Sequence, residues 1–238
     1  MGRIRTRLNQ FIVIVGFQLT LGLKIGAKTT LDNFITGKNK ELVDFIKELL
    51  QTRQSVYAHV LGAPATGKTH LFQAACQALV YQGFQAGYID LSHLNHLEIL
   101  KGLHQLKLVC FDNLDAVSNE KDLHLLGAFI KTALGKGHQI LTASKEPLPE
   151  IIKQYIHSHD EFKLEQLHDK DLKTAVKLKA EERGLLLPAD VEECLIIRAE
   201  ISPYPMKEII SLLDKLERAC DLEKKKVNLS FFKTILKE

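Results

Sequence analysis

The chain has 238 residues, a formal net charge of +3, and 45% apolar and 26% charged side chains. These values are typical of a globular protein with an α/β domain of ordinary size and a smaller second domain, and they exclude a long disordered chain. The small net charge gives no support to nucleic-acid binding, which requires clustered positive charge.

The sequence contains no apolar run of the roughly 18 residues that a membrane-spanning helix needs, so we expect no membrane association. The apolar residues 11–15 follow three arginines and resemble the start of a signal peptide, but the run is short and no small-residue cleavage site follows it. The cysteines are far apart and form no metal-ligand pattern, which favours reduced core residues in a cytoplasmic protein. They are Cys76, Cys110, Cys194 and Cys220.

Along the chain, three regions differ in pattern. Residues 1–30 lack a helical period and are predicted to form an arm. Residues 31–164 alternate short β-prone runs with segments of helical period, which predicts an α/β domain with a parallel sheet. Residues 165–238 are helical only and predict a small bundle. The expected strands are 56–61, 86–91, 106–111 and 139–143, and the expected helices are 41–50, the segment after residue 69, 93–103, 122–134, 169–183 ending at Gly184, and three more after Pro188.

The segment GAPATGKT at residues 62–69 fits the P-loop pattern G-x-x-x-x-G-K-[ST] without a mismatch. A β-prone run precedes it and a helical period follows, so its backbone N–H groups and the helix N-terminus would converge on phosphate groups. In this pattern Lys68 reaches the β- and γ-phosphates and the Thr69 hydroxyl ligates Mg²⁺. A glycine-rich turn that only opens a helix is the alternative. The predicted nucleotide-binding residues here are Gly62, Ala65, Thr66, Gly67, Lys68, Thr69 and His70.

A second element follows at residues 108–112, an apolar strand that ends in Asp112 and has the Walker B form. Such a strand would carry Asp112 to the edge of the sheet beside the P-loop, where it could hold Mg²⁺ together with Thr69. Any buried strand can end in an aspartate, so the signal is strong only in combination with the P-loop. Together the two elements predict bound ADP or ATP with Mg²⁺.

With these motifs the chain resembles the AAA+ ATPases of the bacterial replication initiator family, DnaA, and among them the short homologues that inactivate the initiator. The resemblance runs from about Gln18 to Glu238. It implies an AAA+ P-loop NTPase fold of class α/β, with a parallel sheet and a small C-terminal helical lid domain at 165–238. The resembling segments are 31–39, 67–75, 111–114, 141–144 and 187–191.

Several positions depart from the pattern of that family. Initiators have an acidic residue directly after the Walker B aspartate, whereas Asn113 cannot act as a base. Asp115, two residues on, is expected to point away from the site. The usual aspartate of the sensor 1 strand is Ser144.

The positively charged residues of the family are also replaced. The arginine finger position falls at Tyr155, with Lys153 two residues earlier, and the sensor 2 arginine falls at Lys207 in the lid. A lysine can meet a phosphate as a point charge but lacks the planar fork of arginine, so Lys207 is kept as a predicted nucleotide contact. The departures predict nucleotide binding with slow intrinsic hydrolysis, and no residue is assigned a catalytic role.

The arm carries the sequence QLTLGL at residues 18–23, which resembles the clamp-binding motif of the short homologues. In an extended arm its leucines would share one side and could enter an apolar groove. A strand that packs on the protein's own sheet would show the same alternation. The predicted clamp-binding residues are Gln18, Leu19, Leu21 and Leu23.

The resemblance implies a cytoplasmic negative regulator of replication initiation that binds the sliding clamp and the initiator DnaA and promotes hydrolysis of initiator-bound ATP. It implies no DNA-binding domain, and it leaves a homo-oligomer open. Two alternatives stay open: a self-sufficient AAA+ ATPase such as a loader or remodelling motor, and an AAA+ adaptor that tethers another replication or division protein.

Overall fold

The computed structural model describes residues 12–15, 29–93, 100 and 102–236. The chain divides into two compact units. The first runs to Leu164, and the second consists of Glu165–Glu238 together with Ile35–Lys38 and Pro64–Thr66.

The first unit contains a six-stranded sheet in the order β1-β3-β4-β5-β2-β6. Five strands are parallel, and β1 pairs antiparallel with β3 at one edge. The central strands are buried on both faces, as expected for a parallel sheet covered by helices, and the predicted α/β fold is confirmed. The strands are β1 Ile12–Val15, β2 Val56–Gly62, β3 Ala86–Asp90, β4 Leu108–Asp112, β5 Gln139–Ser144 and β6 Asp160–Leu164.

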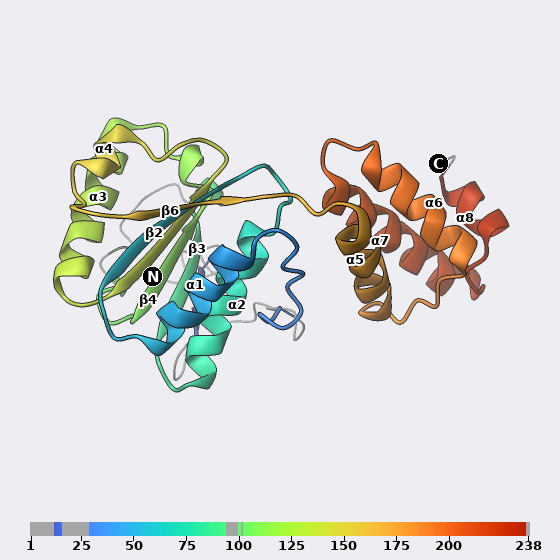
Figure 1. Cartoon of the computed structure of the whole chain (residues 1–238), viewed down its shortest axis with the longest axis horizontal. Helices are drawn as coiled ribbons and strands as arrows, with labels where there is room; N and C mark the ends of the chain where they lie inside the picture. The colour runs from blue at the N-terminus through green and yellow to red at the C-terminus, as the bar shows by residue number, and fades with distance from the viewer. Residues whose placement is uncertain (1–11, 16–28, 94–99, 101, 237–238) are drawn as a thin grey trace, which may run out of the picture. The chain divides into compact units, whose positions relative to one another are not determined.

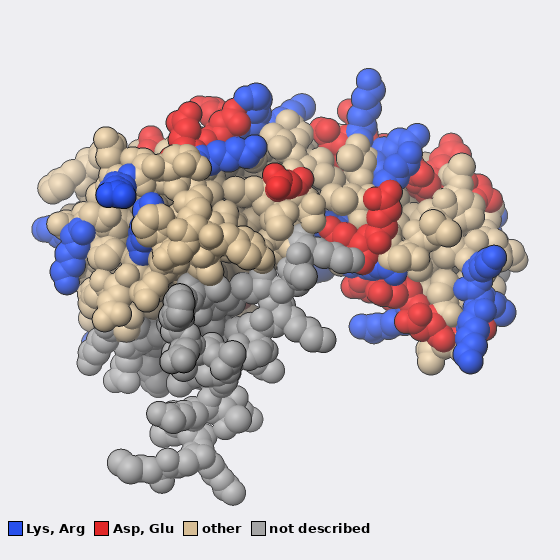
Figure 2. Space-filling model, turned by 90° about the horizontal axis from the view of Figure 1, so that it is seen from below, with Lys and Arg blue, Asp and Glu red and all other residues tan. Residues whose placement is uncertain are grey.

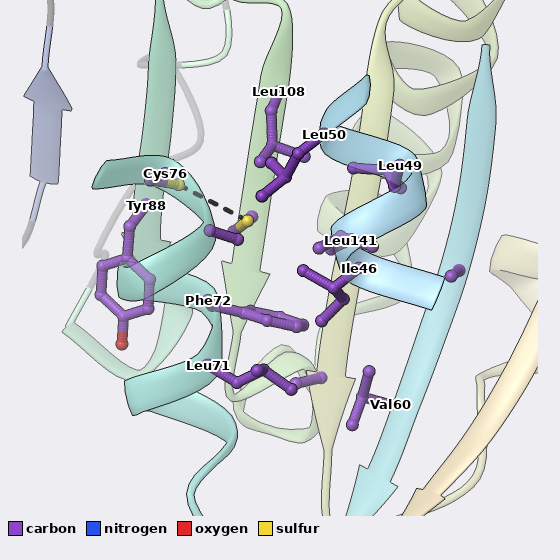
Figure 3. Close-up of a cluster of buried hydrophobic side chains, with 14 of the residues drawn as sticks. Ile46, Leu49, Leu50, Val60, Leu71, Phe72, Cys76, Tyr88, Leu108 and Leu141 are labelled. Atoms are coloured by element: carbon purple, nitrogen blue, oxygen red, sulfur yellow. Dashed lines mark hydrogen bonds between the residues drawn. The ribbon is translucent and has the colours of Figure 1, made fainter. Parts of the chain in front are cut away.

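Helices cover both faces of this sheet (Figure 1). On one face, α1 (Lys40–Gln51) and α2 (Lys68–Tyr81) enclose a core that includes Ile46, Phe72 and Tyr88 (Figure 3). On the other face, α3 (Glu120–Gly135) and α4 (Glu150–Lys153) pack on a second core. Short 3₁₀ turns follow β3 and β4, at Leu91–His93 and Leu114–Ala116.

Two strands were not predicted from the sequence. Residues 12–15 were assigned to the arm, yet they pair with β3 from Ile12↔Ile89 to Val15↔Ala86. The strand β6 joins β2 at the opposite edge, and its sequence DEFKL is too polar and too short to show a clear alternation. Most of the helix predicted at 93–103 lies outside the described residues.

The second unit contains four helices in its described part. Gly184 ends α5 in the left-handed conformation, with φ of 68°, and Leu185 N–H donates to the carbonyl of Ala180 at 3.0 Å, as the sequence predicted for a C′ glycine. The side chains of Leu172, Leu195 and Phe232 are fully buried between the helices. None of the helices in the described part of the chain is long and apolar enough to cross a bilayer. The four helices are α5 Asp169–Glu181, α6 Ala189–Glu200, α7 Pro205–Glu223 and α8 Leu229–Ile235.

Candidate nucleotide-binding site

The P-loop lies between β2 and α2, as the sequence predicted. Gly67 precedes the first residue of α2 with φ of 106°, and a Cβ at this position would lie 3.0 Å from the ring of Phe34. Glycine is therefore required here both by the backbone and by the close approach of an aromatic ring. Ala65 also has positive φ, 62°, a conformation that residues other than glycine rarely adopt. Ala65 and Thr66 form the loop tip with Pro64.

The ammonium group of Lys68 is held inside the loop. Its Nζ donates to the carbonyl oxygens of Gly62 at 2.6 Å and Ala63 at 2.9 Å. Burial lowers the pKa of Lys68, and the nearby charges of Asp112 and Asp115 oppose that shift. The ammonium group of the only lysine in residues 62–69 is thus held by two backbone carbonyl oxygens of the loop, where its charge would attract a phosphate.

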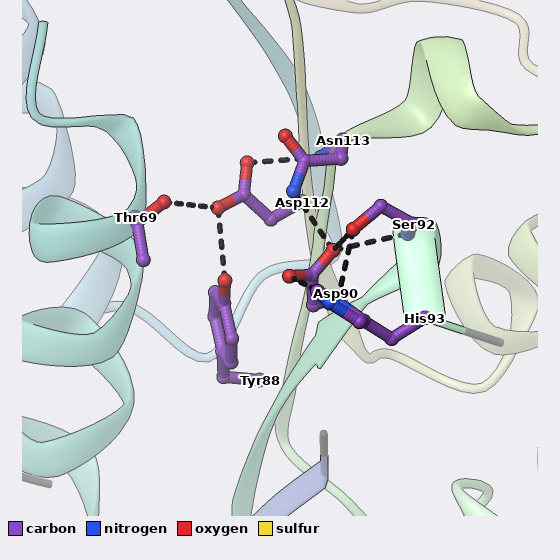
Figure 4. Close-up of polar contacts among 7 residues, drawn as sticks. All are labelled: Thr69, Tyr88, Asp90, Ser92, His93, Asp112 and Asn113. Carbon is purple, nitrogen blue, oxygen red and sulfur yellow. Dashed lines mark hydrogen bonds and ion pairs between the residues drawn. The ribbon is translucent and has the colours of Figure 1, made fainter. Parts of the chain in front are cut away.

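Thr69 and Asp112 meet as the two motifs predicted. The Thr69 hydroxyl in the first turn of α2 donates to Asp112 Oδ2 at 2.5 Å, across the gap between the helix and the end of β4 (Figure 4). Hydroxyl and carboxylate oxygens are the ligands that Mg²⁺ prefers, so the donor set fits this ion. If Mg²⁺ binds, these two residues would hold it, and it would neutralise charge on the nucleotide phosphates.

Two further residues contact Asp112, and the sequence did not single out either of them for this role. The hydroxyl of Tyr88, on β3, donates to Asp112 Oδ2 at 2.9 Å, and the backbone N–H of Asn113 donates to Oδ1 at 2.9 Å. Tyr88 was interpreted only as part of a strand. Its contact depends on the register of β3 against β4, where Tyr88 pairs with Cys110 and Asp90 with Asp112.

The side chain of Asn113 is fixed by a second carboxylate. Asn113 has φ of 56°, and its Nδ2 donates to Asp90 Oδ1 at 2.8 Å. Asp90 also accepts from the backbone and hydroxyl of Ser92 and lies 3.0 Å from His93 Nδ1. Burial raises the pKa of Asp90, but the hydrogen bonds from Ser92 and Asn113 outweigh it, and the net shift is downward. Asn113 is thus a donor held against an ionised group and supplies no base.

Asp115 does not replace the missing base. Its carboxylate accepts from the backbone N–H of Lys145 at 3.1 Å and forms an ion pair with Lys145 Nζ at 3.6 Å. The group is therefore held by the segment that follows β5, but its charge lies near enough to Lys68 to act on the pKa of that lysine. The expectation that Asp115 points away from the site stays a prediction.

Ser144, which the resemblance assigns to the sensor 1 position, belongs to a buried polar chain between β2 and β5. Its hydroxyl donates to the carbonyl of Glu146 and lies 3.1 Å from His59 Nε2. His59 Nδ1 lies 2.9 Å from the Thr142 hydroxyl, which is 2.8 Å from the hydroxyl of Tyr57. Burial lowers the pKa of His59 to about 4, so the imidazole is neutral at pH 7.

Tyr155, which the resemblance assigns to the arginine finger position, is packed against its own unit. Its hydroxyl lies 2.9 Å from His124 Nδ1, and its ring covers Gly127 so closely that a Cβ there would lie 2.3 Å from it. Lys153 Nζ donates to Glu150 at 2.7 Å. Lys207 is exposed in the first turn of α7 in the second unit, and its contact with a nucleotide stays a prediction.

His70 and the segment before α1 lie next to the P-loop. His70 Nε2 is 3.1 Å from the carbonyl oxygen of Thr30, and its ring contacts Phe34 edge to face at 5.6 Å between centroids. Thr30 and Phe34 were not predicted as site residues, although Phe34 lies in the segment 31–39 that carries the family resemblance. The predicted clamp-binding residues, Gln18, Leu19, Leu21 and Leu23, lie outside the described residues.

Solved structures of replication and recombination proteins have a similar fold. The chain is 16% identical to domain III of the Thermotoga maritima replication initiation protein DnaA, with a TM-score of 0.76 over 89% of this chain and 97% of that one. It is 21% identical to AMPPCP-bound DnaA from Aquifex aeolicus, with a TM-score of 0.61 over 86% of this chain and 77% of that one. The chain therefore has the fold of DnaA domain III.

The likeness is shared with a motor protein of the same fold. For the Thermotoga maritima RuvB Holliday junction branch migration motor the identity is 17% and the TM-score 0.69, over 88% of this chain and 71% of that one. No family model matches the chain. At these identities the comparisons establish the fold, and the activity has to be argued from the site.

Proposed function

We propose that this chain is a nucleotide-binding AAA+ protein related to DnaA that acts in DNA replication and holds ADP or ATP with Mg²⁺ at the P-loop. The observation that carries the proposal is the hydrogen bond between Thr69 and Asp112, because it joins the two motifs in one place beside Lys68. The AMPPCP bound to the Aquifex aeolicus protein supports a nucleotide ligand for this fold.

The finer role follows from the resemblance to Hda, the short DnaA homologue. We propose a cytoplasmic regulator that binds the DNA polymerase sliding clamp through Gln18, Leu19, Leu21 and Leu23, contacts ATP-bound DnaA, and promotes hydrolysis of the ATP held by that partner. This role needs a stable nucleotide-bound module rather than a fast ATPase. Two contacts support slow hydrolysis: the side chain of Asn113 is held by Asp90, and the hydroxyl of Tyr155 contacts His124.

A pull-down of the purified protein against clamp and DnaA, with ADP, with ATP or without nucleotide, tests the role directly. The matched variant is Gln18→Ala with Leu21→Ala. It should no longer bind the clamp, and its melting temperature should stay within about 1 °C of that of the wild type. A core strand would behave differently, because removing a buried leucine side chain costs about 2 to 5 kcal/mol. A destabilised variant that still binds the clamp would refute the proposal that residues 18–23 bind the clamp.

The second candidate is a self-sufficient motor, favoured only by the similarity to RuvB. A general base is worth about 10² to 10⁴ in rate, and an arginine finger about 10³ to 10⁵. Because Asn113 and Tyr155 supply neither group, the purified protein should release phosphate far more slowly than about once per second. Turnover at or above that rate without partners would favour the motor.

One face of the helical unit bears on the choice between a protein partner and DNA. In the face shown in Figure 2, acidic and basic side chains of the described residues are interspersed on the helical unit. Nucleic-acid sites instead gather lysine and arginine on one surface. An adaptor for another replication or division protein would share this surface, and the pull-down separates it from the regulator by the identity of the bound partner.

A further inference from the structure

Asp112 is a fully buried carboxylate, and the groups that hydrogen-bond to it are all neutral. Burying an ionised carboxylate is costly unless hydrogen bonds and opposite charge compensate for it. Among the described residues, no lysine, arginine or histidine forms an ion pair with Asp112. The hydrogen-bond donors around Asp112 thus include no cationic side chain, and a carboxylate oxygen in such surroundings suits a cation held nearby.

The three donors to Asp112 differ in how firmly they are held. Thr69 is itself a predicted ligand of the metal, and the Asn113 N–H belongs to the residue adjacent in the chain. Tyr88 comes from another strand, is 5% exposed, and its ring is enclosed in the core under α2 (Figure 3).

The position of Tyr88 follows from the sheet register. Tyr88 lies opposite Cys110 on β4, two residues before Asp112, so its ring lies one pleat away from the carboxylate and its hydroxyl reaches forward to Oδ2. A phenylalanine would fill the same core volume without the hydroxyl. A buried tyrosine hydroxyl normally finds a partner, and here the partner is the carboxylate at the candidate metal site.

We propose that Tyr88 is a positioning residue for Mg²⁺: its hydroxyl fixes the Asp112 carboxylate in the orientation needed to hold the ion that accompanies the bound nucleotide. The inference rests on the proposed nucleotide-binding function and adds a residue that the P-loop and Walker B patterns do not contain. Tyr88 acts through Asp112 and touches neither nucleotide nor metal.

The test is calorimetric titration of ADP into wild type and Tyr88→Phe, once with excess Mg²⁺ and once with EDTA. Loss of a group that orients a metal ligand typically costs about 10- to 100-fold in metal affinity. We expect Tyr88→Phe to bind ADP about tenfold more weakly with Mg²⁺ and to change by less than about twofold with EDTA.

Tyr57→Phe is the matched control. Tyr57 is also a buried strand tyrosine with a hydrogen-bonded hydroxyl, but its partner is Thr142 and it packs in the other core. It should leave the ADP affinity unchanged in both buffers. Tyr88→Met, which replaces the ring with a flexible apolar side chain, provides a second variant without the hydroxyl if Tyr88→Phe does not fold.

The outcomes are separable. If wild type does not bind ADP with Mg²⁺, the proposed function fails. If wild type binds and Tyr88→Phe binds equally well, or loses the same factor with EDTA as with Mg²⁺, the role of Tyr88 is overturned. An equal, Mg²⁺-dependent loss in Tyr57→Phe would also overturn it, because the effect would then not depend on Asp112.

Discussion

Two polar networks lie in the same sheet and differ in charge. The first centres on Asp112 and joins β3, β4 and α2, and all its hydrogen-bond donors converge on one carboxylate. The second runs from Tyr57 to Ser144 between β2 and β5 and contains no ionised group at pH 7. A network centred on a carboxylate is suited to an external metal ion, whereas a network of hydroxyl groups and a neutral imidazole is suited to hold strands together.

One consistent assignment of the hydrogens in the second network starts from the Ser144 hydroxyl. The Ser144 hydroxyl donates to the Glu146 carbonyl, so its oxygen accepts from His59 Nε2–H. His59 Nδ1 is then the acceptor for the Thr142 hydroxyl, which in turn accepts from Tyr57. Because the single hydroxyl hydrogen of Ser144 is donated to the carbonyl of Glu146, the side chain has no hydrogen left to donate to a phosphate.

The largest expected effect concerns His59. An unfolded histidine has a pKa near 6.5 and the folded one about 4, so the unfolded chain binds more protons between these values. The free energy of unfolding therefore has its full value, as far as His59 is concerned, above pH 6.5. It falls by up to about 3 kcal/mol as the pH drops toward 4. Urea unfolding of wild type and His59→Gln at pH 7 and pH 4 should show that the variant lacks this loss.

The exposed His157→Gln is the control for His59 and should keep the wild-type dependence on pH. If His59→Gln loses as much stability on acidification as wild type does, His59 is not the group responsible.

The next largest effect is expected when the hydrogen bond between Asn113 and Asp90 is removed by mutation. Asn113→Asp alone would place two carboxylates about 2.8 Å apart, and such a pair shares a proton, which raises one of the two pKa values. Its ATP turnover at pH 7 should stay within about tenfold of wild type. Adding Asp90→Asn removes the second carboxylate, and turnover should rise by about 10²-fold, the lower value for a general base. Phosphate release under single-turnover conditions measures both.

If the single variant Asn113→Asp already reaches the rate of the double variant, Asp90 does not control this position. The thermal melting curves of both variants should be recorded alongside the rates, so that loss of fold is not taken for loss of turnover.

A smaller effect is expected for Lys68→Ala, which removes the cation from the P-loop. The dissociation constant for ADP or ATP should rise more than about tenfold, or more than about 1.4 kcal/mol, in calorimetric titration. Lys145→Ala removes an exposed lysine that pairs with Asp115, and it should change affinity by less than about twofold. Equal affinity of Lys68→Ala and wild type would show that the P-loop does not bind nucleotide in the predicted way.

The smallest effect on binding is expected for Ser144→Ala. Because the serine hydrogen is used within the neutral network, the ratio of ADP to ATP affinity should change by less than about twofold. Stability should fall by about 1 to 3 kcal/mol, since His59 Nε2 loses its acceptor. A shift of tenfold or more in the ATP to ADP ratio would instead identify Ser144 as a phosphate contact.

The sequence predicted the parts of the site that are local in the chain. Lys68 and Thr69 were identified because eight consecutive residues define the loop, and Asp112 because it ends an apolar strand. The parallel sheet followed from the alternation of strand and helix, and the structure confirms it.

The remaining parts depend on strand register, which the sequence did not reveal. Tyr88 and Asp90 gain their roles only because β3 is placed next to β4 with Asp90 opposite Asp112. His59 and Ser144 meet for the same reason between β2 and β5. The edge strand β6 was missed because its residues are mostly exposed and carry no apolar alternation long enough to recognise.

The close contact of Tyr155 with Gly127 limits how this protein could be changed by mutation. An arginine at position 155 would leave the slot over Gly127 empty and His124 without its phenol partner. Conversely, any side chain added at Gly127 would displace the tyrosine ring. A substitution at Tyr155 alone would therefore lose the packing over Gly127 and the contact with His124, so an arginine could be introduced there only at a cost in stability.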